Sequence, residues 1–536
     1  MRLRVQGLTA GRGAVLALAL LATAGPASAR TEVAPYIELD QTFIANLKGG
    51  GNDFLTYTSV AAGADVRVET QRSDAQVALR YEHQFGWNRH SADQDIFSGL
   101  ARGSYAVLPG KLSLEAGGIA TRTRIGSFTG ANGALAAAGD NTRSVYSLFA
   151  GPSFTTRVGE ATVKAAYRFG YTHVDDNWGR SGIGLSGFDS SGNSTSHNLN
   201  ASVGMQPGAL PFGWSVGGGY EREAIDALDQ RYVDKWVRGD LTVPVSSTLA
   251  LVGGAGYEKM QISQRRVAID ADGKPEVDDK GRYVLDKSAP RLMSYDTDGF
   301  IWDAGVLWRP SRRTSLEARV GRRYGSMHYI GSFRWQASPE SLVQIAYFDT
   351  IDSLGRSMNG GLAGLSTGFT GWTNPFSNEL TGCVTGTSGG TCFNDALAAI
   401  NASNYRHRGV SALYSYTGRR WNWGAGLGAS QRKFLAPDVG VLASINGLKD
   451  YYYYAQLFGM MRLNSYSSLS GSVYANYSDR GRGGVDVANY GAYLSYGRLF
   501  GRRLMGRASL GVDAVDGDSI DQIIALLGQV GVRYTF

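Results

Sequence analysis

From residue 33 onward, apolar and polar residues alternate along short segments that are separated by turns. In 161–172 every second position is apolar: Ala161, Val163, Ala165, Tyr167, Phe169 and Tyr171. The positions between them are small or polar, with Lys164 and Arg168 among them. Because successive side chains of a β-strand point to opposite faces, this period of two predicts strands with one apolar and one polar face.

The same alternation recurs near residue 320 and at the end of the chain. In 315–324 the apolar Leu316, Ala318 and Val320 alternate with Glu317 and Arg319. The last strand alternates in the same way and ends on a carboxyl-terminal aromatic residue, Phe536. An alternating strand with this ending resembles the assembly signal that bacterial outer-membrane barrels present to their assembly machinery.

The connections between the expected strands alternate between long and short. The long ones are 44–54, 88–95, 125–143, 174–194, 265–298, 350–405 and 434–450. The short ones are 71–74, 109–111, 158–160, 246–248, 310–314, 337–341, 417–420 and 464–467. A single-chain barrel with both termini in the periplasm predicts short inner turns, long outer loops and an even number of strands.

We therefore predict an all-β fold, a transmembrane antiparallel up-and-down barrel of about 22 strands, within an even range of about 18–22. The connection at 325–327 is short where a long one is expected, so the count can be too high or too low by two. Aromatic residues near the ends of the apolar faces, such as Trp214 and Trp308, favour a membrane barrel over a soluble sandwich, because outer-membrane barrels carry aromatic girdles at both interfaces.

The first 29 residues have the pattern of a secretory signal peptide. Three arginines precede an apolar core at 14–24, and Ala27-Ser28-Ala29 fits the cleavage rule, which places the cut before Arg30. Residues 30–536 would then form the barrel, in the outer membrane of a Gram-negative bacterium. Cleavage lowers the formal net charge from +7 to +4, because it removes three arginines and no acid. No run of basic residues of the nucleic-acid-binding type is present.

The polar strand faces carry charges of both signs, which we expect to line the lumen of the barrel. These candidates are Arg67, Arg80, Arg168, Arg238, Arg319, Arg323, Arg533, Glu82, Glu115, Asp240 and Glu317. Two interpretations remain open. The charges either pair with one another and brace a wide barrel, or they form an arginine-lined conduit that attracts anions.

Two further features lie in the expected long loops. Cys383 and Cys392 in 350–405 are candidates for a small disulfide, because an exported protein reaches an oxidising compartment. Asp270 and Asp272 in 265–298 resemble part of a calcium loop, but the full spacing and its closing glutamate are missing. We expect a solvated hairpin extension there, and no metal site or cofactor.

No catalytic motif is present. The chain has no GxSxG, HExxH or phosphate-binding loop, and its six histidines are scattered over strand ends and loops. His173 beside Asp175 and Asp176 comes nearest to the His/acid set of a membrane-embedded hydrolase, but we interpret these as solvated rim residues. The sequence does not predict an enzyme.

Several stretches point to one group of barrels: PYIEL at 35–39, LTYTSVAAGADV at 55–66, VYSLFAGPSFTTRVGEATVKAAYRFGYT at 145–172 and the closing VRYTF. They resemble an outer-membrane barrel family of sphingomonad type that accompanies exopolysaccharide and PEP-CTERM systems in proteobacteria. The resemblance implies a role in surface polysaccharide export or envelope organisation. It carries no functional residues over to this chain.

The leading hypothesis is a porin-like channel for export of an anionic exopolysaccharide. Its partners would be outer-membrane lipid, the barrel-assembly machinery, the anionic polysaccharide and a periplasmic export partner. The strands begin near residue 33, which leaves no room in this chain for an N-terminal plug domain. The alternative is a structural or surface-binding barrel that acts through its long loops and has a lumen closed by paired charges.

Overall fold

The computed structural model describes residues 30–49, 54–87, 93–124, 142–175, 192–278, 282–377, 380–386, 389–398, 403–481, 486–518 and 520–536. The expected signal peptide, residues 1–29, lies outside the described residues, and so does Asp176. No helix among them is long and apolar enough to cross a bilayer.

Strands dominate the structure, and 22 of them form one sheet. The first eleven are β1 (Arg30–Lys48), β2 (Phe54–Glu69), β3 (Ser73–Gly86), β4 (Gln94–Leu108), β5 (Leu112–Arg124), β6 (Thr142–Val158), β7 (Ala161–Val174), β8 (Asn193–Met205), β9 (Gly213–Ile225), β10 (Gln230–Pro244) and β11 (Leu249–Gln264). The other eleven are β14 (Leu292–Ser311), β15 (Thr314–Arg323), β16 (Ser326–Trp335), β17 (Ser341–Asp352), β21 (Asn404–Thr417), β22 (Trp421–Leu435), β23 (Lys449–Arg462), β24 (Ser467–Asp479), β25 (Val487–Leu499), β26 (Leu504–Gly517) and β27 (Ile520–Thr535).

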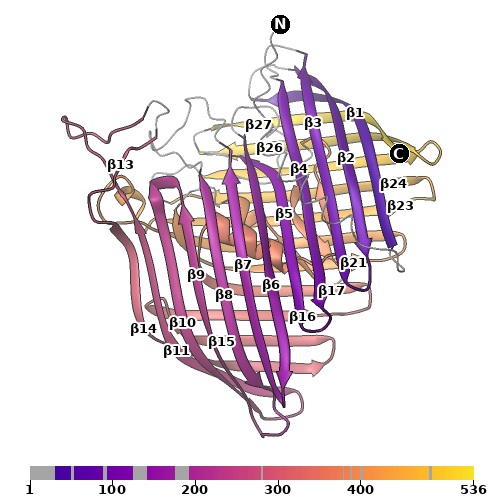
Figure 1. Cartoon of the computed structure of the whole chain (residues 1–536). Helices are drawn as coiled ribbons and strands as arrows, with labels where there is room; N and C mark the ends of the chain where they lie inside the picture. The colour runs from indigo at the N-terminus through magenta and orange to yellow at the C-terminus, as the bar shows by residue number, and fades with distance from the viewer. Residues whose placement is uncertain are drawn as a thin grey trace.

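The sheet closes on itself because the first strand pairs with both the second and the last. In β1, Tyr36 lies opposite Gly63 of β2 on one side and Thr535 of β27 on the other, and both pairings are antiparallel. Figure 1 shows the strands following one another around the wall in chain order. The predicted antiparallel up-and-down barrel of 22 strands is confirmed.

The connection that left the strand count uncertain is a tight turn between β15 and β16. Its two residues, Tyr324 and Gly325, have φ values of 55° and 69°. Two consecutive positive φ angles are typical of the type I′ turn, whose twist matches that of a two-residue hairpin. The outer end of the barrel therefore has one very short connection, and the strand count keeps its parity.

Large apolar side chains cover the outside of the barrel, as the alternating pattern predicts. On β27 the outward Leu526, Val530 and Val532 are exposed, whereas the inward Leu527 and Gln529 are buried. A closed sheet pairs its backbone groups internally, and this apolar outer band matches the hydrocarbon of a bilayer. The chain is an outer-membrane β-barrel of the Gram-negative type.

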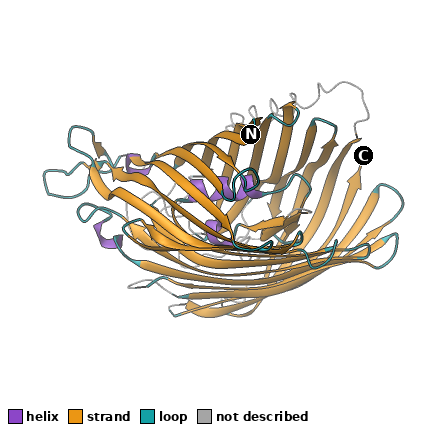
Figure 2. Ribbon diagram, turned by 90° about the horizontal axis from the view of Figure 1, so that it is seen from below, coloured by secondary structure: helices purple, strands orange, loops and turns teal. Residues whose placement is uncertain are grey.

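The long connection that was expected at 350–405 as an extracellular loop runs from 353 to 403 and folds inside the barrel. It contains α2 (Leu354–Gly364), β18 (Phe369–Thr373), β19 (Leu380–Gly386), β20 (Gly389–Cys392) and α3 (Asn394–Leu397). Figure 2 shows its helices within the ring of strands. Our expectation of an exposed loop here was wrong, because its apolar side chains are buried against the inner wall. We call residues 353–403 the internal loop.

The other long connection is shorter than the expected 265–298, because β14 begins at Leu292. It forms a narrow hairpin extension with β12 (Arg266–Val267) paired to β13 (Leu285–Asp286). This extension projects beyond the rim at the upper left of Figure 1. Its apolar residues, Leu285 among them, pack with Leu442 of the loop that follows β22.

Candidate functional site

Helix α2 begins the internal loop and presents one apolar stripe to the wall. Ser353 caps it, with its hydroxyl oxygen accepting a hydrogen bond from the backbone N–H of Arg356 at 3.2 Å. Leu354, Met358 and Leu362 follow at intervals of four residues and are buried. This spacing places them on one face of the helix.

The inner wall supplies a matching apolar surface. Leu100 of β4, Ile119 of β5 and Phe149 of β6 form one buried cluster with residues of the internal loop, including Met358 and Leu362. Burial of one such side chain contributes about 1.5–3 kcal/mol. Packing against the wall therefore holds the helix inside the barrel.

The rest of the internal loop forms a small three-stranded sheet, β18–β20, beside α3. A disulfide joins Cys383 of β19 to Cys392 of β20, with the two Cα atoms 3.9 Å apart. The bridge lies against Gly426 of β22, where an added Cβ would come within 2.6 Å of the Cys383 sulfur. The bridge therefore stiffens a segment in the lumen, whereas the sequence had suggested an exposed loop.

The internal loop extends through the lumen to the end of the barrel where both chain termini lie. Gln76, near the start of β3 at that end, donates a hydrogen bond to the carbonyl of Phe369 at 2.8 Å. Tyr57, near the outer end of β2, donates one to the carbonyl of Phe376 at 2.8 Å. Thr367 donates to the carboxylate of Asp74, the second residue of β3, next to the periplasmic connection. The segment thus reaches from the outer rim to the periplasmic end.

An ion pair fastens the start of the internal loop to the wall. The Arg356 guanidinium lies 2.5 Å from a carboxylate oxygen of Glu223 on β9, and both side chains are almost fully buried. The Ser353 hydroxyl donates to the same carboxylate at 2.8 Å, and the Tyr232 ring centroid lies 3.6 Å from the guanidinium carbon. A buried charge without a partner is costly, so this contact fixes the position of the loop.

The other end of the internal loop carries a partly buried carboxyl group. Ser430 of β22 donates a hydrogen bond to Asp395 of α3 at 2.6 Å. Burial raises the pKa of the Asp395 carboxyl above its ordinary value of 3.8, although the Ser430 hydroxyl and the charge of Arg432 act in the opposite direction.

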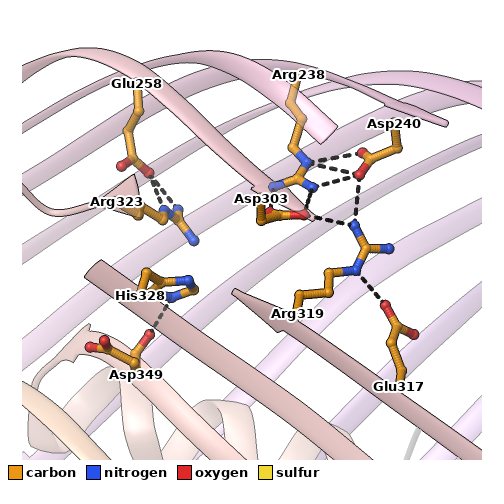
Figure 3. Close-up of polar contacts among 9 residues, drawn as sticks. All are labelled: Arg238, Asp240, Glu258, Asp303, Glu317, Arg319, Arg323, His328 and Asp349. Atoms are coloured by element: carbon orange, nitrogen blue, oxygen red, sulfur yellow. Dashed lines mark hydrogen bonds and ion pairs between the residues drawn. The ribbon is translucent and has the colours of Figure 1, made fainter. Parts of the chain in front are cut away.

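Four of the predicted lumenal residues meet in one network on β10, β14 and β15. Arg238 lies 2.6 Å from Asp240 and 2.5 Å from Asp303. Arg319 lies 3.0 Å from Asp240, 3.1 Å from Asp303 and 2.7 Å from Glu317. Figure 3 shows the two guanidinium groups sharing the two aspartates. The network ties neighbouring strands together across the inner wall.

A second network lies beside the closing seam of the barrel. Arg80 of β3 forms ion pairs with Glu38 and Asp40 of β1 and with Glu82, the last at 3.0 Å. Arg507 of β26 reaches the same Asp40 at 3.0 Å. The acids of β1 are thus held between strands on both sides.

The remaining candidates are more dispersed. Arg533 pairs with Asp65 at 2.6 Å, Arg323 donates to Glu258 at 2.8 Å, and Arg102 lies 2.5 Å from Glu115. Arg168 differs from these, because its guanidinium lies 5.4 Å from the Phe149 ring centroid. Arg67 lies 3.8 Å from Glu69, and both of these side chains are more than half exposed.

Most of the predicted arginines thus lie within 4.0 Å of a carboxylate, as the first of the two sequence interpretations requires. Sequence reasoning missed several of the partners: Glu38, Asp40, Asp65, Asp303, Glu258 and Arg507. The alternation of β1 could have identified Glu38 and Asp40, since Ile37 and Leu39 lie on the opposite face. Glu223 and Arg356 could not be paired from sequence, because their contact requires the internal loop to fold inward.

No group of three or more metal-ligating side chains occurs within the described part of the chain. His173 lies on β7 and contacts Asn193 at 2.9 Å. The Asp270 carboxylate accepts from its own loop backbone at Asp272 and Lys274, at 3.0 and 2.8 Å, within the hairpin extension. These contacts belong to a local turn.

No protein-family model and no curated protein matches this chain. Among solved structures it is similar to the alcaligin outer-membrane receptor FauA of Bordetella pertussis, at 12% identity and a TM-score of 0.41, covering 93% of this chain and 76% of that one. It is also similar to the FrpB iron transporter of Neisseria meningitidis, at 11% identity and a TM-score of 0.45, covering 94% and 82%. A third is the ferric-catecholate import receptor Fiu of Escherichia coli, at 9% identity and a TM-score of 0.45, covering 93% and 81%.

Proposed function

We propose that this protein is a gated outer-membrane channel, in which the barrel is the conduit and the internal loop is the gate. The observation that carries the proposal is the position of residues 353–403, which extend along the lumen from Ser353 at the outer rim to Thr367 beside Asp74. A barrel that served only as a scaffold would not need an inner wall with both an apolar surface and a charged group that bind this loop.

Noncovalent contacts hold the gate against the wall. Its contacts are an apolar cluster, one buried ion pair and single hydrogen bonds, such as that between Ser147 and Asn359 at 3.1 Å. Each of these contributes only a few kcal/mol and can be exchanged for others when the loop moves. The covalent disulfide, by contrast, lies within the loop and moves with it.

The nature of the solute is a second part of the proposal. The lumenal arginines are largely paired with carboxylates. We therefore expect the channel to pass polar solutes in general and to select only weakly for anions. An anionic exopolysaccharide, with a periplasmic export partner, remains our candidate substrate on the basis of the family resemblance alone. The alternative of surface binding loses one of its two loops, because residues 353–403 lie inside the barrel.

Deletion of residues 359–401 tests the gate. Purified wild-type and deleted barrels would be inserted in planar bilayers, and their conductance and ion selectivity measured. We expect small or intermittent conductance from the wild type and a large, steady conductance from the deleted barrel. Equal conductance from two correctly folded barrels would contradict the proposal.

A further inference from the structure

A hollow lies in the outer surface of the barrel beside its closing seam. It has a volume of about 470 Å³ and extends over five neighbouring strands, β25, β26, β27, β1 and β2. Much of its lining consists of exposed apolar side chains on the outward face of the wall: Leu39, Tyr496, Phe500, Val530 and Val532. Because the outward face of a membrane barrel contacts lipid, the hollow opens to the bilayer.

Two small residues of β26, Gly506 and Ala508, form the floor of the hollow. Ala508 lies opposite Tyr496 of β25 on one side and opposite Val530 of β27 on the other. The Tyr496 hydroxyl lies 3.1 Å from that of Ser467 on β24, which directs the ring away from β26. Small side chains between larger neighbours therefore leave a groove in the wall.

The groove follows one row of residues that lie opposite one another on successive strands: Tyr496, Ala508, Val530, Gln41 and Thr58. Five strands at a spacing of about 4.8 Å make this row about 19 Å long. Because barrel strands tilt by about 40°, a row across them rises through the membrane by about 12 Å. The hydrocarbon of one leaflet is about 15 Å thick. The groove therefore suits one acyl chain that lies obliquely within a single leaflet.

Two arginines lie at the periplasmic end of the hollow, on either side of β26. Arg498 of β25 is exposed and lines the hollow, and its guanidinium carbon lies 5.8 Å from the Phe500 ring centroid. Arg503, in the turn before β26, donates to the hydroxyl of Tyr534 on β27 at 3.4 Å. The Phe500 ring lies against Gly506, where an added Cβ would come within 2.7 Å of it. Two positive charges thus flank the point where the groove meets the periplasmic interface.

These two outward arginines keep free hydrogen-bond donors. Among the described residues, neither Arg498 nor Arg503 has a carboxylate within 4.0 Å, and the Arg503 side chain donates one hydrogen bond, to Tyr534. The inward Arg507 of β26 differs, because it pairs with Asp40 at 3.0 Å. A guanidinium presents its N–H donors in a fork that matches the oxygens of a phosphate group. Arg498 and Arg503 can therefore bind a phosphate without giving up an ion pair.

We propose that this hollow binds an anionic phospholipid of the inner leaflet. One acyl chain lies along the groove over Gly506 and Ala508, and Arg498 and Arg503 bind the phosphate of the headgroup. A headgroup with a net negative charge is favoured, because no carboxylate balances the two guanidinium groups. This inference concerns the outer surface and does not depend on the internal loop acting as a gate.

Photochemical labelling by a modified lipid tests the proposal. The complete barrel, folded in phosphatidylcholine vesicles, would receive the same trace amount of phosphatidylglycerol or phosphatidylcholine that carries a diazirine in one acyl chain. After photolysis, mass spectrometry would quantify the label on peptides that contain 504–508 and 530–532. Peptides that contain 314–320 are the matched reference, because β15 also follows a turn with two arginines, Arg312 and Arg313, and lies outside the hollow.

We expect phosphatidylglycerol to label the hollow about tenfold more than phosphatidylcholine does, which corresponds to one charge-assisted hydrogen bond, and to show a much smaller preference at 314–320. R498Q/R503Q should reduce the labelling by phosphatidylglycerol to the level of phosphatidylcholine. R312Q/R313Q is the matched control and should leave the labelling of the hollow unchanged. Equal labelling of the hollow by the two lipids, or an equal preference at 314–320, would overturn the proposal.

A second substitution tests the groove separately from the charges. Ala508→Leu places a larger side chain on the floor of the hollow, so most of the labelling there by both lipids should be lost. Ala318→Leu is the control, because Ala318 is exposed on the outward face of β15, outside the hollow. Undiminished labelling in Ala508→Leu would show that no acyl chain occupies the groove.

Folding of each variant would be checked by heat-modifiable migration on gels. If R498Q/R503Q does not fold, the comparison of the two lipids on the wild-type barrel, at the hollow and at 314–320, decides the outcome.

Discussion

The guanidinium of Arg356 lies 2.5 Å from the carboxylate of Glu223, and this buried pair joins the internal loop to the barrel wall. Glu223 also accepts hydrogen bonds from the hydroxyls of Ser353 and Ser194. One carboxylate on β9 thus serves three partners, two of them in the loop. The position of the internal loop therefore depends on the negative charge of Glu223.

Neutralising this carboxylate should release the start of the loop. In Glu223→Gln, Arg356 stays buried, loses the nearer of its two carboxylates and keeps Asp352 at 3.8 Å, at a cost of at most about 3–5 kcal/mol to the docked state. We expect more frequent opening in single-channel recordings. Glu317→Gln is the matched control, because Glu317 pairs with Arg319 away from the loop and is partly exposed. Equal opening in both variants would show that the Glu223 contact does not hold the gate.

How much of this structure the sequence predicts depends on the range of the interactions. The alternation of Leu526, Val530 and Val532 with inward residues identifies β27 from neighbouring positions alone, and the same holds for most strands. Closure and strand number follow from the lengths of the connections. These features need only local patterns and the rule that a membrane sheet must close.

Local patterns do not predict that the internal loop folds into the lumen. Its helix contains Gly360 and Gly361, which each cost about 1 kcal/mol relative to alanine within a helix, so the segment resembles an exposed glycine-rich loop. Packing of Met358 and Leu362 against the wall compensates for this cost, and the wall is far away in the sequence. The short pairing of β16 with β17, limited to 331–335 and 343–347, could not be predicted for a similar reason, since both strands alternate normally.

A side chain added at Gly426 should displace the disulfide hairpin. The Cβ of residue 426 would lie 2.6 Å from the Cys383 sulfur, closer than two such atoms can approach. Gly426→Val should therefore raise the open probability and leave the barrel folded. The control is Gly528→Val, because no heavy atom lies within 4 Å of a Cβ at that position. If only the folding of the Gly426 variant is affected, the expectation fails.

Removing the disulfide should loosen the gate without weakening the barrel. The bridge spans a sequence separation of 9 residues, for which loop closure accounts for about 2.5 kcal/mol. Cys383→Ser with Cys392→Ser should therefore increase the conductance fluctuations. The temperature at which the barrel unfolds on gels should stay the same. A lower unfolding temperature would mean that the bridge supports the wall itself.

Acid should favour the closed state through Asp395. Burial raises the pKa of this carboxyl in the docked loop above the 3.8 of a free group, so the docked state binds the proton more strongly. The contribution to docking is complete below the free pKa and is lost as the pH rises through the raised value. We expect conductance to fall on acidification over this range, and Asp395→Asn to remove that part of the dependence. An unchanged pH profile in Asp395→Asn would contradict the assignment.

A reversible tether between the loop and the wall tests the gate most directly. Ser147 of β6 and Asn359 of α2 are in hydrogen-bond contact, so S147C/N359C can form a disulfide with the loop docked. S113C/S153C is the control, because these two serines lie 3.0 Å apart within the wall. Single-channel conductance of both pairs and of the wild type would be recorded before and after addition of a reductant. The account predicts that the oxidised S147C/N359C barrel stays closed and opens on reduction beyond the change seen in the wild type, while the wall pair behaves like the wild type. Full opening of the oxidised, tethered barrel would contradict it.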